Sequence, residues 1–296
     1  MVKFEIGFVG LGAMGQAIVS RIIQAEHAVV VHDLSASAVD VMVEKGATAL
    51  DDNVPLGLGK NLVFLSVSHA DIMEKIICEE GGLLDSMDDG GIIVDLGTTP
   101  IKQCRELAAL AKIKGKVFLS GSTPWAEAGS LAMMIGGDET AYEQVLPILK
   151  SFANKIHYLG DTGNGQLVKL CHQLTFVSTI TGLSEAIALA EHHGLEAKTV
   201  LQVLDDCVAP RHVIDFMLPM AENERFDQRG GTLKLGHKDL QAVQKSAEDV
   251  SLQLPLAEVL LSYMDKAMNN GWQEADLFSL VDMARDEFYA RGKKEL

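Results

Sequence analysis

Residues 161–194, DTGNGQLVKLCHQLTFVSTITGLSEAIALAEHHG, carry a long helical pattern. Asp161 or Thr162 can cap its start, and Gly194 is placed to end it. Apolar residues are spread around most of the helical cylinder, which is typical of a buried helix. At about 1.5 Å per residue this helix would be on the order of 45 Å long, longer than a small domain. We therefore expect the central helix of a second domain, entered directly from the first.

The first turns of this helix contain a lysine. Lys169, His172 and Gln173 are spaced i, i+3 and i+4, so they share one face. An ammonium group in a buried helix needs a partner or a lowered pKa. The helix alone leaves two interpretations open: Lys169 extends to solvent at the helix end, or it donates a proton at a domain boundary.

Composition limits the class of protein. A chain of 296 residues with 48% hydrophobic residues is long enough for about two domains with substantial cores. The net charge of −16 argues against a general affinity for nucleic acids or anionic membranes, but it leaves room for a small anionic substrate.

The cysteines and the N-terminus indicate a reducing compartment. Cys78, Cys104, Cys171 and Cys207 form no CxxC pair, and we expect free, buried thiols. The sequence shows neither a signal-peptide pattern nor a run of about 18 apolar residues. We therefore expect a cytoplasmic protein.

A glycine-rich turn follows the first strand pattern, residues 4–9. It reads GLGAMG over residues 10–15 and leads into a helix over 13–25 and a strand over 28–31. In a GxGxxG turn the first glycine permits the tight turn, the second admits a pyrophosphate and the third lets helix pack on strand. We expect a dinucleotide site, the alternative being a glycine turn in another kind of α/β protein. The expected cofactor-binding residues are Gly10, Leu11, Gly12, Ala13, Met14 and Gly15.

Asp33 lies 23 positions after the first glycine, at the end of the second strand pattern. A carboxylate there accepts hydrogen bonds from a ribose and repels a 2′-phosphate, and no arginine follows closely. The sequence therefore favours NAD over NADP. The alternative is that Asp33 only caps the next helix.

Strand and helix patterns then alternate up to residue 159. Strands are expected over 61–67, 91–96, 116–119, 131–135 and 156–159, and helices over 70–78, 100–113 and 139–152, with Thr99 as the cap of the second. Ligands of such sheets bind beyond the carboxyl ends of the strands. That rule places Val67, Ser68, Thr98 and the 120–126 loop at the site, unless these residues only form caps and turns.

Only helical patterns follow the central helix, over 197–204, 213–222, 232–250, 255–269 and 276–290. We expect an α/β Rossmann-type N-terminal domain, followed by an all-α C-terminal domain built on the long central helix. The expected boundaries are 1–161 for the dinucleotide-binding domain and 162–296 for a helical substrate and dimerisation domain.

Three segments together resemble the β-hydroxyacid dehydrogenase family: GFVGLGAMG at 7–15, GNGQLVKLCHQ at 163–173 and GHKDL at 236–240. The family includes 3-hydroxyisobutyrate dehydrogenase and, more distantly, 6-phosphogluconate dehydrogenase. The resemblance covers essentially the whole chain. It implies homodimers or homotetramers, and a hydride transfer between a nicotinamide and a small 3-hydroxy acid or its semialdehyde.

The resemblance also implies roles for single residues. Lys169 matches the family's catalytic lysine, which gives a proton to the carbonyl oxygen or takes one from the hydroxyl. Lys238 matches a lysine that reaches the cofactor, and Thr98 matches a threonine close to the nicotinamide. From the sequence alone, Lys238 is a solvated helix residue beside Asp239.

Two positions depart from the family pattern. Gln173 replaces an asparagine that binds substrate, so the amide is kept and one methylene is added. The substrate loop reads FLSGSTPWAEAGSL over 118–131, shorter than in the family and without its aspartate. Its hydroxyl and N–H groups can still bind a carboxylate. The expected carboxylate-binding residues are Ser120, Gly121, Ser122 and Thr123.

Arg211, in VAPRH, is a second candidate anchor for an acidic substrate, the alternative being a surface helix start. No histidine spacing indicates a metal site.

Two other functions stay open. One is an imine reductase, which shares this architecture but usually carries Asp or Tyr at the lysine position. The other is a cofactor-binding protein without turnover, suggested by the altered loop and Gln173.

Overall fold

The structure is a computed structural model of the 296-residue chain. It describes residues 4–50, 54–122, 131–192, 194–206, 211–223, 226, 231–249 and 251–285. The chain divides into two compact units, residues 1–169 and 170–296, and the division falls inside one long helix.

The first unit is built on an eight-stranded sheet of order β3-β2-β1-β4-β5-β6-β7-β8 within the described residues. All neighbouring strands are parallel except β6 and β7. The strands are β1 (Ile6–Val9), β2 (Val29–His32), β3 (Thr48–Ala49), β4 (Leu62–Leu65), β5 (Ile92–Asp95), β6 (Val117–Ser122), β7 (Leu131–Gly136) and β8 (Ala153–Tyr158). The strand order reverses between β1 and β4, which is where sheets of this type bind ligands.

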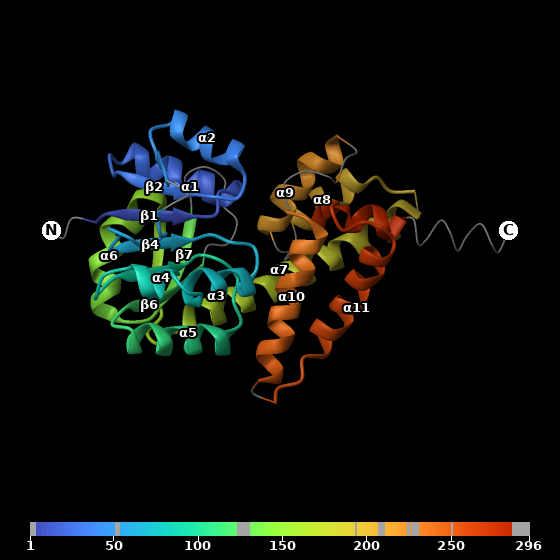
Figure 1. The fold of residues 1–296 in the computed structure, drawn as a ribbon. Helices are drawn as coiled ribbons and strands as arrows, with labels where there is room; N and C mark the ends of the chain where they lie inside the picture. Colours follow the sequence, from blue (N-terminus) through green and yellow to red (C-terminus); the bar gives the residue numbers. More distant parts are fainter. Residues whose placement is uncertain are drawn as a thin grey trace. The chain divides into compact units, whose positions relative to one another are not determined.

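Helices cover both faces of this sheet (Figure 1). They are α1 (Ala13–Gln24), α2 (Ala36–Glu44), α3 (Ala70–Cys78), α4 (Leu83–Ser86), α5 (Ile101–Ile113) and α6 (Glu139–Phe152). Successive residues of a strand point to opposite faces of the sheet and pack into two separate cores. Leu62 and Phe64 of β4 pack with α1 and α6, whereas Val63 and Leu65 pack with α3, α4 and α5. The continuous apolar runs in the sequence follow from this two-sided burial.

The second unit is helical, and no strand is present in its described residues beyond an isolated bridge between Thr232 and Asp276. Its helices are α7 (Asn164–His192, shared with the first unit), α8 (Ala197–Asp206), α9 (Arg211–Glu222), α10 (Leu233–Glu248), α11 (Pro255–Asn269) and the 3₁₀ turn η1 (Leu277–Ser279). Val177, Ile180 and Ile187 of α7 are fully buried in its core. The predicted fold class, a Rossmann-type domain followed by an all-α domain, is confirmed.

Several boundaries match the predictions, and α3, α6 and α11 match to the residue. The elements α2, β3 and α4 were not predicted. Ser35, whose hydroxyl accepts from the Ala38 N–H, is the capping signal that would have located α2. Part of the helix predicted over 276–290 lies outside the described residues, and residues 280–285 are helical.

The prediction of Thr99 as a helix cap was wrong. The N-cap of α5 is Pro100, which has no side chain to accept a hydrogen bond. The Thr99 hydroxyl instead donates to Asp95 Oδ2 at 2.8 Å. A carboxylate forms stronger hydrogen bonds than a neutral acceptor, so the Thr99 hydroxyl points toward the buried Asp95 and not toward the start of α5.

Burial around α7 was also overestimated. Leu167 is 43% exposed and Val168 is 40% exposed, and Cys171 on the same side is exposed as well. No other described part of this chain covers that face. In its first turns, the helix is therefore buried on one side and exposed on the other.

The cysteines are free as predicted where the structure describes them, but burial was predicted correctly only for Cys104. Cys78 and Cys171 are exposed, and Cys207 lies outside the described residues. Burial, followed by the nearby Asp95 charge, raises the pKa of the Cys104 thiol well above its ordinary value. None of the helices in the described part of the chain is long and apolar enough to span a membrane.

Candidate active site

The glycine-rich turn has the backbone geometry that its sequence predicts. Gly10 follows β1 with φ of +97°, a conformation that L residues rarely adopt, and a Cβ there would overlap the Ser66 carbonyl oxygen. A Cβ on Gly15 would overlap the carbonyl oxygen of Gly10. At Gly12, by contrast, a Cβ would meet no heavy atom within 4 Å. Two of the glycines are thus needed by the fold itself, whereas the middle one faces open space.

The start of α1 is open to a ligand. Its N-cap is Gly12, no side chain caps the helix, and Gly12 and Ala13 are exposed. The first N–H groups of a helix and its dipole favour an anion such as a pyrophosphate. The residues present therefore fit the phosphates of a dinucleotide.

A pocket of about 460 Å³ continues from this turn, lined among others by Leu11, Gly12, Gln16, Asp33 and Ser35. Asp33 Oδ2 accepts from the Leu11 N–H at 2.6 Å, and Oδ1 accepts from the Ser35 N–H at 2.8 Å. Each carboxylate oxygen has a further lone pair for a ribose hydroxyl. None of the residues found to line this pocket is a lysine or an arginine.

The other predicted crevice residues of the first unit lie at the same edge of the sheet. Val67 and Ser68 follow β4, and Thr98 follows β5; both strands run parallel to β1. Val67 and Thr98 are half-buried, and Ser68 is exposed. The structure thus brings them to the edge that carries the glycine turn, as predicted.

Two buried polar side chains tie the start of α7 to this edge. Asp95, at the end of β5, has no exposed surface and accepts from the Gly97 N–H at 2.7 Å and the Thr99 hydroxyl at 2.8 Å. Gln166 Nε2 lies 3.1 Å from Asp95 Oδ2, 3.0 Å from the Gly97 oxygen and 3.1 Å from the Gly121 oxygen. Gln166 Oε1 accepts from the Thr99 N–H at 3.2 Å. One amide therefore joins the first turn of α7 to β5 and β6.

The GNG segment lets the helix approach this closely. A Cβ on Gly165 would overlap the Ser120 carbonyl oxygen, and Gly163 has φ of +93°. The Gly163 N–H donates to Ser120 Oγ at 2.9 Å, and that hydroxyl donates to the Gly136 oxygen at 3.1 Å. Ser120 is fully buried. Its hydroxyl therefore supports the start of α7, and a substrate role for this residue stays a prediction.

Lys169 lies three residues after Gln166 on α7, hence on the same side of the helix. Its side chain is buried, with 6% exposure. The interpretation that Lys169 extends into solvent at the helix end is therefore excluded. A buried amine one helical turn beyond the sheet's carboxyl edge is suited to proton transfer.

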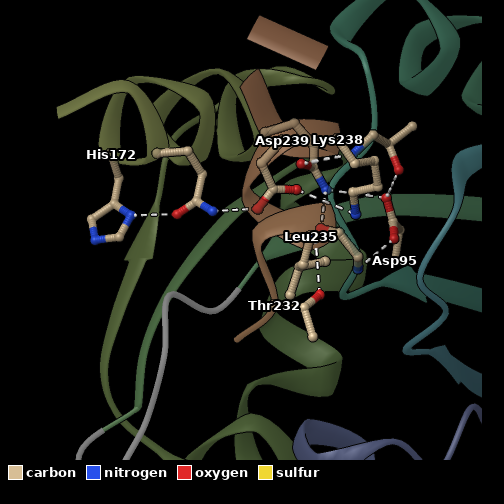
Figure 2. Close-up of polar contacts among 10 residues, drawn as sticks. Asp95, His172, Thr232, Leu235, Lys238 and Asp239 are labelled. Carbon is tan, nitrogen blue, oxygen red and sulfur yellow. Dashed lines mark hydrogen bonds and ion pairs between the residues drawn. The ribbon is translucent and has the colours of Figure 1, made fainter. Parts of the chain in front are cut away.

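A second polar group belongs to the helical unit. Gln173 Nε2 donates to Asp239 Oδ2, and Gln173 Oε1 lies 3.0 Å from His172 Nδ1. Lys238 Nζ lies 3.2 Å from Asp239 Oδ1, and Asp239 is 3% exposed. Figure 2 shows His172, Asp239 and Lys238 along this chain of contacts, with the Thr232–Leu235 capping bond of α10 beside them. Lys238 is thus an ion-pair partner of Asp239 rather than a solvated surface charge.

The remaining predicted site residues are described only in part. Ser122 ends β6 and Arg211 begins α9, but the positions of their side chains are not described; Thr123, with Pro124 and Trp125, lies outside the described residues. Among the described residues, no group of three or more His, Cys, Asp or Glu side chains has a geometry for a metal ion.

Sequence reasoning missed Gln166 and His172 as site-forming residues, along with the contacts of Asp95 and Asp239. The available signal for Gln166 was its spacing, because it shares a helix face with Lys169. For Asp239 it was an acidic residue directly after the motif lysine.

Comparison with known proteins agrees with this arrangement. The family described as the NAD binding domain of 6-phosphogluconate dehydrogenase matches residues 5–160. The family described as NAD-binding of NADP-dependent 3-hydroxyisobutyrate dehydrogenase matches residues 163–284.

Individual relatives cover nearly the whole chain. An NAD-dependent L-serine dehydrogenase of Pseudomonas aeruginosa is 29% identical, over 95% of this chain and 98% of its own. A 2-(hydroxymethyl)glutarate dehydrogenase of Eubacterium barkeri is 28% identical, over 94% of each chain. The structure of a Mycobacterium tuberculosis 3-hydroxyisobutyrate dehydrogenase with L-serine has a TM-score of 0.85 at 22% identity, covering 96% of this chain and 100% of that chain.

Imine reductases share the fold at lower similarity. The one from Streptomyces aurantiacus has a TM-score of 0.63 at 22% identity, covering 94% of this chain and 98% of that chain.

Alanine substitutions at two glycines should separate folding from cofactor binding. We expect Gly15→Ala to lower the melting temperature strongly, because the new Cβ meets the Gly10 carbonyl. We expect Gly12→Ala to keep the melting temperature within about 2 °C but to weaken dinucleotide binding by at least about ten-fold, since only the ligand occupies that space. Thermal unfolding and NADH titration measure the two effects. Equal affinity in Gly12→Ala and wild type would contradict the assignment.

Proposed function

The chain belongs to the β-hydroxyacid dehydrogenase family of NAD(P)-dependent oxidoreductases, and from this we propose that it interconverts a small 3-hydroxy acid and its semialdehyde. The observation that carries the proposal is the buried Lys169, placed one turn after the Gln166 anchor. We retain 1–161 as the proposed dinucleotide-binding domain and 162–296 as the proposed helical substrate and dimerisation domain.

The substrate class is supported by the names of the relatives. L-serine, 2-(hydroxymethyl)glutarate and 3-hydroxyisobutyrate all carry a hydroxyl on the carbon β to a carboxylate. We propose the same class for this chain. These acids differ in the substituent on the carbon that joins the hydroxyl-bearing carbon to the carboxylate. We propose that the altered loop at 118–131 determines which of these substituents the site accepts.

Lys169 is the proposed proton carrier. Bound nicotinamide supplies a hydride in reduction and accepts one in oxidation. Lys169 Nζ gives a proton to the substrate's carbonyl oxygen in reduction and takes it from the hydroxyl in oxidation. Gln173, one turn further along α7, binds a substrate oxygen.

Several proposed contacts complete the site. The substrate carboxylate binds the loop of Ser120, Gly121, Ser122 and Thr123, with Arg211 as a second anchor. Thr98 lies close to the nicotinamide, and Lys238 reaches the cofactor.

We propose NAD rather than NADP as the preferred cofactor. Asp33 presents a carboxylate in the pocket beside the glycine turn, and no lysine or arginine is among its lining residues. A 2′-phosphate would meet negative charge there without a cation to balance it.

We further propose a cytoplasmic homodimer or homotetramer. The exposed face of α7 formed by Leu167, Val168 and Cys171 is apolar and suited to a protein contact. The mass in solution, relative to the 31.9 kDa chain, distinguishes these states from a monomer.

Replacing the proposed proton carrier should stop turnover. We expect Lys169→Arg to lower kcat by more than about 10²-fold, because a guanidinium keeps the charge but does not release its proton. NADH affinity should change by less than about three-fold. The assay follows NADH absorbance across a panel of semialdehydes and 3-hydroxy acids, with cyclic imines as a separate arm.

Lys116→Arg is the matched control. Lys116 is also buried, but it pairs with Asp89 at 3.2 Å. It precedes the first residue of β6, whereas the candidate site lies at the carboxyl ends of the strands. Near-normal kcat in Lys169→Arg would refute the proton-carrier role. Turnover of imines alone would favour an imine reductase, and tight NADH binding without any turnover would favour a binding protein.

The cofactor preference has its own test. We expect Asp33→Ala to reduce the ratio of NADPH to NADH dissociation constants by at least about ten-fold, because the repulsive carboxylate is removed. Both affinities should also fall somewhat, since Asp33 supports the Leu11 N–H. Asp40→Ala, an exposed change of equal charge on α2, is the control. An unchanged ratio in Asp33→Ala would contradict the NAD preference.

A further inference from the structure

We propose that His172 is a positioning residue that fixes the side-chain amide of Gln173, so that Gln173 presents an N–H group to the substrate. The orientation follows from contacts inside the helical unit. The statement about substrate rests on the proposed function above.

Asp239 fixes one end of the amide. A carboxylate only accepts hydrogen bonds, so the group of Gln173 that faces Asp239 Oδ2 must be the amide nitrogen. Asp239 is 3% exposed, and its other oxygen, Oδ1, lies 3.2 Å from Lys238 Nζ. Reversing the amide would place its oxygen against a carboxylate oxygen in a buried setting, which is costly.

His172 fixes the other end. With its nitrogen on Asp239, Gln173 turns its oxygen to His172 Nδ1 at 3.0 Å. A carbonyl oxygen only accepts, so Nδ1 must carry the proton that it donates. The hydrogen bond made by one ring nitrogen selects the tautomer of a neutral imidazole. The neutral form of His172 is therefore the Nδ1–H tautomer.

Aromatic packing holds the His172 ring in place. It stacks on Phe176 one turn further along α7, with ring centroids 5.7 Å apart and planes 14° apart. Phe176 in turn meets the buried Phe278 edge-on at a centroid distance of 6.4 Å. The imidazole is thus part of a packed aromatic row and keeps Nδ1 directed at Gln173.

The consequence concerns what Gln173 can bind. Its oxygen is engaged by His172 and one of its N–H groups by Asp239, which leaves the second N–H. A donor selects an oxygen acceptor, such as the carboxylate or carbonyl oxygen of the substrate, over an ammonium or other donor group. Because the contact with His172 helps to set the direction of the amide, Gln173 and His172 act as a pair.

Two substitutions at His172 separate hydrogen bonding from packing. His172→Phe keeps an aromatic ring to stack on Phe176 but removes the donor. His172→Asn removes the ring but places an amide N–H near the position of Nδ1. We expect His172→Phe to raise KM for the hydroxy acid about ten-fold with a smaller change in kcat, and His172→Asn to stay within about three-fold of wild type. NADH affinity should be unchanged in both variants.

The opposite ranking of the two variants by KM would overturn the proposal. If His172→Phe keeps KM and His172→Asn raises it, the residue acts by packing alone. Equal losses in both variants, accompanied by lower melting temperatures, would also mean a purely structural role.

A readout without turnover tests the same bond. Long-range ¹H–¹⁵N spectra of histidine-labelled protein, recorded where imidazoles are neutral, identify each ring's tautomer, and the His172 signals are those lost in His172→Asn. We expect Nδ1–H in wild type and a shift toward Nε2–H in Gln173→Leu. An Nε2–H wild type would overturn the proposal. If no hydroxy acid is turned over, the proposed function fails, and the tautomer still decides the role of His172.

Discussion

A buried hydrogen-bonded contact between a carboxylate and an amide holds the site together. Asp95 ends β5 and Gln166 lies in the first turn of α7, 71 residues later. The amide also bonds the backbone of Gly97, Thr99 and Gly121. Removing one member of such a network leaves buried polar groups unpaired, at about 1–3 kcal/mol for each. The start of α7 is therefore fixed to the carboxyl edge of the sheet.

The rest of the site depends on that constraint. Gly165 permits the close approach, since any side chain there would meet β6. Lys169 follows one turn after the anchor and is buried. Gln173 follows one turn later still, where Asp239 and His172 orient its amide. The proposed proton carrier and the proposed substrate ligand thus occupy successive turns of one helix whose start is fixed.

Much of this arrangement could be predicted from local pattern. The glycine turn, Asp33 and the strand–helix alternation are visible because their spacing along the chain carries the information. The importance of Lys169 came from its resemblance to a family motif, and its burial in the structure excludes a side chain that extends into solvent. The hydrogen-bond partners of Gln166 and Asp239 could not be predicted, because they lie 71 and 66 residues away in the sequence. The exposed face of α7 was missed because an apolar pattern does not say which element covers it.

Amide hydrogen exchange at Gly163 tests the anchor most directly. Its N–H donates to Ser120 Oγ, a bond that a change at Gln166 leaves chemically intact. If Gln166 holds the helix start, Gln166→Met should speed exchange at Gly163 by about ten-fold or more. Gln103→Met, a surface control that loses a bond to Glu74, should leave that rate unchanged. A Gly163 rate in Gln166→Met equal to wild type would contradict the account.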